Sequence, residues 1–270
     1  MPRLTRLDAE LVRRKLARSR DHAVELIAAG RVEVRGVVAA KPATGVGNDV
    51  SIRVTGEEAD PGYVSRGAHK LAGALAAFAG VTVAGRRCLD AGASTGGFTD
   101  VLLRSGAREV EAVDVGYGQL AWSLQTDARV RVHDRTNVRG LTPDDIGGQV
   151  ELTVADLSFI SLPLVLPALT TCTRDDGDVL PMVKPQFEVG KDRLGAGGVV
   201  RDPALRAEAV LGVARHAAAL GWPAHGVVRS PLPGPAGNVE FFLWLRRGPD
   251  GALDEDEIVD IATTREEADR

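Results

Sequence analysis

From Ser65 onward the sequence alternates between short apolar runs, typical of buried strands, and longer segments with helical spacing. Few folds accommodate that order, because a helix between two strands lets them pair in parallel while the helices cover the faces of the sheet. Seven runs read as strands: 87–92, 109–116, 129–134, 150–158, 177–185, 224–232 and 239–247. The pattern predicts an α/β fold, a doubly wound and mostly parallel seven-stranded sheet of the Rossmann-like type.

Helix signals fill the intervals between these strands. Ser65 is placed to cap a helix that runs through Phe78 and is stopped by Gly80. Further helices are expected at 98–106, 162–172 and 203–220. The last two strands are close together in sequence, so we expect them to form a hairpin that gives the sheet an antiparallel edge.

Residues 1–58 have a different pattern, two short helices followed by strands. Ser19 can cap the second helix, Gly30 ends it, and Gly36 turns the strand that follows. Residues 1–41 hold ten Lys or Arg and five Asp or Glu, a local charge of +5 that is a first hint of a nucleic-acid partner for this small α+β domain. The chain is therefore divided into this domain at 1–58, a linker at 59–64, an α/β main domain at 65–248 and an acidic tail at 249–270.

The net charge of −4 hides this asymmetry, since residues 249–270 carry nine Asp or Glu and two Arg. No apolar run approaches the roughly 20 residues that span a bilayer. The charged N-terminus lacks the apolar stretch of a signal peptide, so we expect a cytoplasmic protein without a membrane partner. Cys88 and Cys172 lie far apart without CxxC spacing, which predicts buried apolar residues and neither a disulfide nor a zinc site.

Acidic residues follow the strand-like runs, at the edge where a doubly wound sheet has its ligand crevice. Asp90 ends the first strand and is followed by a glycine loop with Gly92, Gly96 and Gly97. A carboxylate there suits an ammonium group better than a phosphate, and S-adenosylmethionine offers an ammonium, two ribose hydroxyls and no phosphate. Asp114, at the end of the second strand, is placed to accept both hydroxyls. The loop therefore predicts S-adenosylmethionine in preference to NAD.

A second candidate set consists of charged residues outside this loop: Lys70, Asp156, Lys184 and Glu240. Taken singly, each reads as a surface charge. Asp156 and Lys184 differ from ordinary surface charges because both end strands in apolar surroundings, where an unpaired charge is costly.

Six ordered motifs carry a family resemblance: SRGAHKL (65–71), DAGASTGGFTD (90–100), DVGYGQL (114–120), ADLSFISL (155–162), VKPQFE (183–188) and GNVEFFLWL (237–245). Together the chain resembles, up to about residue 247, the TlyA family of haemolysin-A-like ribosomal RNA 2′-O-methyltransferases, whose catalytic domain is of the FtsJ type. The N-terminal unit resembles the RNA-binding module of small-subunit ribosomal protein S-four. The resemblance implies methyl transfer from S-adenosylmethionine to ribose 2′-hydroxyls of cytidines in the ribosomal RNA of both subunits.

The resemblance also implies roles for individual residues. The implied catalytic tetrad is Lys70, Asp156, Lys184 and Glu240, in which Lys184 hydrogen-bonds the ribose hydroxyl and accepts its proton. S-adenosylmethionine is expected at Asp90, Gly92, Ser94, Gly96, Gly97, Phe98, Asp114 and Asp134. RNA phosphates are expected at Arg3, Arg6, Arg14, Arg18 and Arg20. No metal is expected.

Aromatic residues, on which unpaired bases stack, make up only 4% of the chain. Those in or near the cleft motifs are Tyr117, Trp122, Phe159 and Phe187. Core packing is the expected role of Trp122 and Phe159, and a structural role that of His69. The expected partner is ribosomal RNA within ribosomal subunits; the oligomeric state is open, with a monomer slightly favoured.

Two alternative functions remain. A small-molecule methyltransferase could use the same sheet, although the basic N-terminal unit argues against it. An RNA-binding factor without turnover could keep the same fold, although the complete tetrad argues against that.

Overall fold

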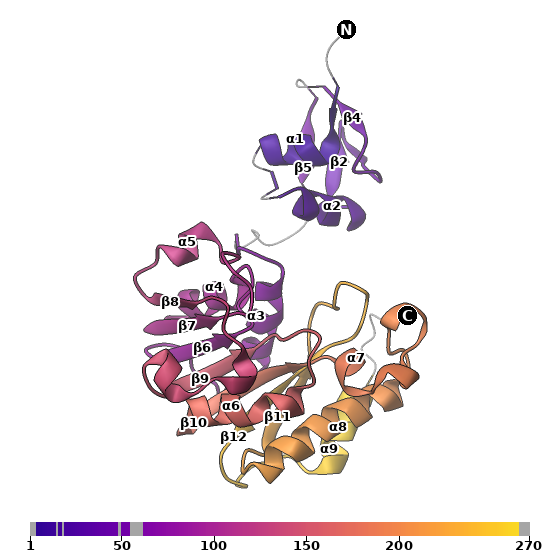
Figure 1. The fold of residues 1–270 in the computed structure, drawn as a ribbon. Helices are drawn as coiled ribbons and strands as arrows, with labels where there is room; N and C mark the ends of the chain where they lie inside the picture. The colour runs from indigo at the N-terminus through magenta and orange to yellow at the C-terminus, as the bar shows by residue number, and fades with distance from the viewer. Residues whose placement is uncertain (1–3, 15, 18, 48–49, 55–61, 265–270) are drawn as a thin grey trace. The chain divides into compact units, whose positions relative to one another are not determined.

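The computed structural model describes residues 4–14, 16–17, 19–47, 50–54 and 62–264. The chain divides into two compact units, Met1–Gly62 and Tyr63–Arg270, each of which is described by itself (Figure 1).

The first unit packs two helices, α1 (Leu7–Arg13) and α2 (Arg20–Ala28), on short antiparallel strands. Ser19 caps α2 as expected, since its Oγ accepts the backbone N–H of His22 at 3.1 Å. Arg35 and Gly36 both have positive φ and turn the chain between two of the strands. One sheet has the order β3-β2-β5, formed by Val37–Val38, Val32–Val34 and Ile52–Val54, and a second pairs β1 (Thr5–Arg6) with β4 (Gly45–Val46).

The second unit contains the expected seven-stranded sheet, in the order β11-β12-β10-β9-β6-β7-β8. The strands are β6 (Arg87–Ala91), β7 (Glu109–Val113), β8 (Val130–His133), β9 (Val150–Ala155), β10 (Thr173–Val183), β11 (Ala224–Arg229) and β12 (Phe241–Arg246). Five of them, β6 to β10, pair in parallel. The hairpin of β11 and β12 is also present, and as expected it gives one side of the sheet an antiparallel pair of strands. β12 is the reversed strand and lies between β10 and β11, so the edge strand β11 runs in the common direction.

Helices cover both faces of this sheet. One face packs against α6 (Leu166–Cys172), α8 (Pro203–Ala219) and α9 (Glu255–Thr263), and Figure 1 shows α8 and α9 running side by side. The other face packs against α3 (Gly67–Ala77) and α4 (Gly97–Arg104). Two short helices, α5 (Trp122–Gln125) and α7 (Pro185–Glu188), follow strand ends, and short 3₁₀ turns complete the connections.

The start of α3 differs from its expected form. The helix begins at Gly67 with Arg66 at the N-cap position, and no side chain caps it, so the expected cap at Ser65 was wrong. Ser65 lies instead against the start of α4, because a Cβ on Gly97 would come within 2.3 Å of its hydroxyl oxygen. Gly97 therefore lets the first turns of α3 and α4 approach closely.

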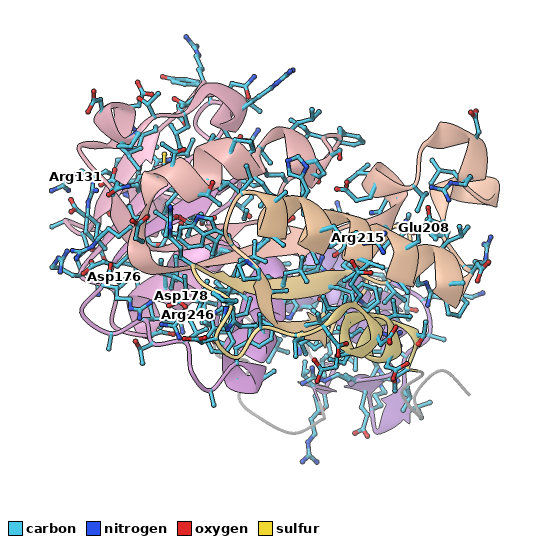
Figure 2. The ribbon with its side chains drawn as sticks, turned by 90° about the horizontal axis from the view of Figure 1, so that it is seen from below. Arg131, Asp176, Asp178, Glu208, Arg215 and Arg246 are labelled. Atoms are coloured by element: carbon cyan, nitrogen blue, oxygen red, sulfur yellow. The ribbon has the colours of Figure 1, made fainter. Side chains whose placement is uncertain are left out.

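An ionic cluster fixes the pairing of β10 and β12 far from the carboxyl ends of the strands. The buried Asp178 on β10 accepts hydrogen bonds from Arg86 and from the indole N–H of Trp244, the latter at 2.8 Å. Arg246 contacts the same carboxylate at 3.3 Å, and Figure 2 labels these two partners next to each other. These contacts span two neighbouring strands and the loop before β6, so they stabilise the sheet without taking part in the crevice.

The acidic C-terminal segment packs against the second unit where it is described. Asp254 and Glu257 form a capping box at the start of α9, and Ile258 and Ala262 are buried in the core beside α8. One side of α9 is therefore part of the core, and its acidic residues lie on the exposed side.

Two further expectations concern single residues and the membrane. Cys88 and Cys172 are buried as expected, and burial raises the pKa of these thiols to about 12 and about 11. No helix in the described part of the chain combines the length and apolar character needed to cross a bilayer.

Candidate active site

The expected catalytic residues lie together on the side of the sheet at which the parallel strands end, which we call the carboxyl edge. The parallel strands β6, β9 and β10 end there, with Ala91 opposite Ala155 in the register. Because β12 runs the other way, its first residue lies at this edge too, and Val183 pairs with Phe241. Lys184 directly follows Val183, and Glu240 directly precedes Phe241, so Lys184 and Glu240 occupy neighbouring positions on the two strands.

Lys184 and Asp156 form one ion pair of the site. The Lys184 amine lies 2.5 Å from Asp156 Oδ1 and donates a hydrogen bond to the hydroxyl of Ser158 at 2.9 Å. Lys184 is buried, whereas the Asp156 side chain is one-quarter exposed. The pair therefore lies at the boundary between the core and solvent. Ser158 was not singled out from the sequence, although it belongs to the ADLSFISL motif.

Lys70 and Glu240 form the second ion pair. The Lys70 amine, on α3, lies 2.5 Å from Glu240 Oε2, and both side chains are almost fully buried. Gly234 allows this position, because a Cβ there would lie 2.6 Å from Glu240 Oε1. Two lysines and two carboxylates thus meet at the edge in two pairs, which satisfies the charges that each strand end would otherwise leave unpaired.

The glycine loop needs residues without a side chain. Gly92 has φ of 88°, and a Cβ there would lie 2.4 Å from the carbonyl oxygen of Asp156. Gly96 has φ of 96°, and its Cβ would lie 2.2 Å from Leu124. The loop consequently joins the end of β6 to the start of α4 with its backbone close to the β9 end, one wall of the crevice.

Asp90 holds the most unusual carboxylate of the site. It is fully buried at the end of β6, and its Oδ2 accepts the Thr99 hydroxyl at 2.6 Å. Its Oδ1 is also buried and has no hydrogen-bond partner among the described residues. Burial, with smaller contributions from the nearby carboxylates of Asp156 and Asp114, raises the pKa of Asp90 to about 7, although the hydrogen bond from Thr99 acts in the opposite direction. An orphaned buried oxygen of this kind fits a cationic donor such as the ammonium of S-adenosylmethionine.

Asp114 and Asp134 hold the neighbouring loop. Asp114 accepts the backbone N–H groups of Ser94 at 2.8 Å and of Gly116 at 2.7 Å, which ties the glycine loop to the end of β7. Asp134 accepts the N–H of Gly118 at 3.0 Å. Each Asp114 oxygen keeps a further lone pair, so acceptance of ribose hydroxyls is compatible with these bonds.

Phe98 has a different place from the other expected cofactor residues. Its side chain is buried and packs against Phe242, with ring centroids 5.9 Å apart. Only its backbone, in the first turn of α4, is available to the glycine loop.

The aromatic residues near the crevice are exposed, so the expected core packing of Trp122 and Phe159 was wrong. Phe159 is 92% exposed, adopts φ of +64° and lies 5.3 Å from the ring of Phe187. Trp122 is also exposed, and the Arg135 guanidinium lies over the exposed ring of Tyr117 at 4.4 Å. His69 contacts Tyr63 edge to face, in line with a structural role.

The expected RNA-binding arginines of the first unit are engaged by two buried carboxylates. Arg6 and Arg20 both contact Asp8, yet more than half of each arginine side chain is exposed. Arg14 contacts Glu10 and donates to two backbone carbonyls, those of Val50 and Gly47, which favours a structural role.

Arginines of the first unit lower the pKa values of the two carboxylates that they contact. The Arg6 guanidinium holds the pKa of Asp8 far below its usual range, and Arg13 lowers that of Glu10 to about 2. Both acids therefore stay ionised and orient the guanidinium groups. Arg3 and Arg18 lie outside the described residues.

Metal ligands are not grouped in the described part of the chain: no three His, Cys, Asp or Glu side chains come together there as they would around an ion.

Comparisons with known proteins show the family to which the chain belongs. Residues 63–247 match the family model of the FtsJ-like methyltransferases, and residues 5–49 match that of the S4 domain. The chain is 64% identical over 253 residues to the 16S/23S rRNA (cytidine-2′-O)-methyltransferase TlyA of Mycobacterium tuberculosis, covering 94% of each chain.

The chain is also similar to a more distant curated relative and to a solved structure. One is the 23S rRNA (cytidine-2′-O)-methyltransferase TlyA of Campylobacter jejuni, 36% identical over 183 residues that cover 67% of this chain and 70% of the relative. The other is a solved structure from Streptococcus thermophilus that carries the name hemolysin. It has a TM-score of 0.75 at 36% identity and covers 97% of this chain and 95% of that one.

Proposed function

Because the chain belongs to the FtsJ-like methyltransferase family, and within it to the TlyA proteins, we propose that it methylates the ribose 2′-hydroxyl of cytidines in ribosomal RNA. S-adenosylmethionine is the proposed methyl donor, and the RNA of both ribosomal subunits is the proposed substrate. We expect this work to be done in the cytoplasm, where ribosomal subunits are found.

The observation that carries the proposal is the pairing of Lys70 with Glu240 and of Lys184 with Asp156 at one edge of the sheet. S-adenosylmethionine supplies a methyl group that its sulfonium already activates. A ribose hydroxyl is a poor nucleophile, so the protein has to position its oxygen and take up its proton. Four charged side chains at the crevice, beside a glycine loop, meet those two needs.

Lys184 is the proposed contact to the hydroxyl. Its amine already lies within hydrogen-bond distance of Ser158 and Asp156, so its direction is fixed before RNA binds. The Lys184 ammonium first has to release a proton to solvent. The neutral amine can then accept the proton that the hydroxyl loses as the new oxygen–carbon bond forms and the bond between methyl and sulfur breaks, and Asp156 stabilises the ammonium that forms again. Lys70 and Glu240 have the role of positioning residues, since they are buried beneath this edge.

The donor is proposed to bind along the glycine loop. Asp90 Oδ1 is the acceptor for its ammonium, and Asp114 the acceptor for its ribose hydroxyls. The unpartnered oxygen of Asp90 supports this arrangement, because a buried acceptor without a donor is costly unless a ligand supplies one.

The exposed aromatic residues give the RNA a place to stack. Phe159 directly follows Ser158, and its exposed side chain projects from a residue with left-handed backbone angles. This backbone conformation has a conformational energy cost for a bulky residue, and strained residues of this kind are found most often at functional sites. We assign it to a base beside the reacting ribose, and the first unit, with Arg6 and Arg20 exposed on its surface, to RNA phosphates.

Tritiated methyl transfer to ribosomal subunits from a strain that lacks the enzyme tests the proposal. Label should enter the RNA, and mapping should place it on cytidine 2′-oxygens. Transfer to small molecules only would favour the small-molecule alternative. Tight RNA binding without any transfer would favour an RNA-binding factor.

A further inference from the structure

Two segments that follow neighbouring strands are joined at the carboxyl edge. One follows β9 and consists of residues 156–161, which we call the Phe159 loop, and the other consists of residues 184–188 after β10. Their contacts occur in the same order along both segments: Lys184 with Asp156 and Ser158, Phe187 with Phe159, and Glu188 with Ser161. The second segment therefore supports the Phe159 loop along its length.

The Phe159 loop depends on such side-chain contacts for its shape. In the described part of the chain, no hydrogen bond between backbone groups holds residues 157–160. Leu157 and Ile160 pack against the core, whereas Phe159 between them is exposed and has left-handed backbone angles. A bulky residue keeps such a conformation only where the surrounding contacts enforce it. The contacts on either side of Phe159 therefore determine the direction of its ring.

Glu188 holds the end of the Phe159 loop with both oxygens of its carboxylate. Its Oε2 accepts the Ser161 hydroxyl at 2.6 Å, and its Oε1 accepts the backbone N–H of Leu162 at 2.9 Å. Glu188 is itself well anchored, because the next residue, Val189, is buried in an apolar cluster with Ala209 of α8. The carboxylate thus ties the chain after Phe159 to a fixed part of the fold.

The geometry of these contacts matters more than the charge of Glu188. Burial raises the pKa of Glu188, and the hydrogen bonds from Ser161 and Leu162 act in the opposite direction. A glutamine can make both contacts without a charge, because its amide oxygen accepts the N–H while its NH₂ group donates to the Ser161 hydroxyl. Alanine can make neither.

Given the proposed function, on which this step rests, we infer that Glu188 is a positioning residue for RNA recognition, which holds the Phe159 loop so that the Phe159 ring can stack on the base beside the reacting ribose. Phe187 supports the ring from the position before Glu188. An aromatic ring that is oriented before RNA arrives binds a base more tightly than a mobile one, because less conformational entropy is lost on binding.

The test compares Glu188→Ala and Glu188→Gln with a matched control, Asp145→Ala. Asp145 also accepts a hydroxyl and a backbone N–H, both from Thr142, at 2.7 Å and 2.9 Å. It lies in the 3₁₀ turn Pro143–Ile146 before β9, and it takes no part in the site. For each variant, kcat/KM for unmethylated ribosomal subunits, S-adenosylmethionine affinity and thermal unfolding are measured.

Glu188→Ala should lower kcat/KM for subunits by up to about 5–150-fold, the value of one stacked base, with S-adenosylmethionine affinity near that of the wild type. Glu188→Gln should recover most of this loss. Asp145→Ala should lower thermal stability without lowering kcat/KM. Phe159→Ala should lower kcat/KM by itself, and adding Glu188→Ala to it should change kcat/KM by less than about twofold, because the ring that Glu188 positions is gone.

Equal losses from Glu188→Ala in the presence and in the absence of the Phe159 ring would overturn the inference. So would full activity of Phe159→Ala, or a folded Glu188→Ala protein that behaves like Asp145→Ala. If Glu188→Ala does not fold, Ser161→Ala replaces it, since this change removes only one of the two hydrogen bonds. A smaller loss that disappears in the Phe159→Ala background is then expected, and a loss that persists there refutes the assignment. Absence of methyl transfer by the wild type would instead refute the proposed function.

Discussion

Replacing Lys184 by alanine is the most direct test of the proposed chemistry. The substitution removes the amine that lies 2.5 Å from Asp156 and 2.9 Å from Ser158. If that amine aligns the hydroxyl and accepts its proton, the rate of methyl transfer should fall about 10²–10⁴-fold, or roughly 3–5 kcal/mol in the barrier. Affinities for S-adenosylmethionine and for RNA should change much less, because neither ground state depends chiefly on this group.

The same substitution also affects stability, and the structure allows the two effects to be separated. Removing one partner of a fully buried ion pair costs about 3–5 kcal/mol. The Asp156 side chain is one-quarter exposed, so water offsets part of that penalty and a loss of about 1–3 kcal/mol is expected. The double variant Lys184→Ala/Asp156→Ala leaves no orphaned carboxylate. It should recover most of the unfolding free energy while remaining inactive.

Single-turnover methylation of saturating ribosomal subunits is the deciding assay, after folding has been checked by thermal unfolding. Lys184→Arg should rescue poorly, since a guanidinium keeps the charge but does not deprotonate. Ser158→Ala, which removes one hydrogen bond to the amine, should have a smaller effect than Lys184→Ala. If a folded Lys184→Ala protein turns over within a few-fold of the wild type, the tetrad is not the catalytic group and the reasoning fails.

Binding of S-adenosylmethionine should depend on pH through Asp90, whose pKa is about 7 in the folded protein, because below that pH the ammonium of the donor has to displace a proton. Calorimetry should show an affinity that rises toward pH 7 in the wild type and a flat pH profile in Asp90→Asn. Because the folded pKa lies above the unfolded value of 3.8, the wild-type free energy of unfolding should also fall as pH rises through that window, and Asp90→Asn should flatten this dependence. Asp114→Ala should lose two hydroxyl contacts and weaken S-adenosylmethionine binding by about 1.5–3 kcal/mol, and an unchanged affinity would remove Asp114 from the site. Arg6→Ala should reduce the salt slope of RNA binding by roughly 0.7–0.9 and leave donor affinity unchanged, whereas an unchanged slope would mean that Arg6 serves only to hold Asp8.

The sequence predicted those features of the site that depend on local order. The seven strands and the residues that end them can be read from apolar runs. The parallel strands of a doubly wound sheet end on the same side, so the residues that follow them are expected to lie together. Asp90, Asp114, Asp156 and Lys184 were proposed as site residues in this way. Glu240 and Lys70 could be proposed only from the family resemblance, since neither ends a strand.

Other features were beyond sequence reasoning because they depend on tertiary contacts. Nothing in the composition around Phe159 indicates that its ring is exposed, since that follows from a single left-handed backbone angle. Arg6 and Arg20 pair with Asp8, and these residues are up to 12 positions apart in the sequence. A count of charges therefore predicts that the first unit is positively charged, but it does not predict which guanidinium groups are held by a carboxylate.

The reversed strand β12 explains why the tetrad needs the whole sheet. In a purely parallel sheet, a residue that precedes a strand lies at the opposite edge from residues that follow strands. Glu240 precedes β12, and it reaches the edge that holds Lys184 only because β12 runs antiparallel to β10. Placing β12 between β10 and β11, not at the edge, then puts Glu240 beside Lys184 on one side and Arg229 beside Phe241 on the other. The same reversal therefore brings the second ion pair to the crevice, and a change that disrupts the contact of Asp178 with Arg246 should disturb this ion pair as well.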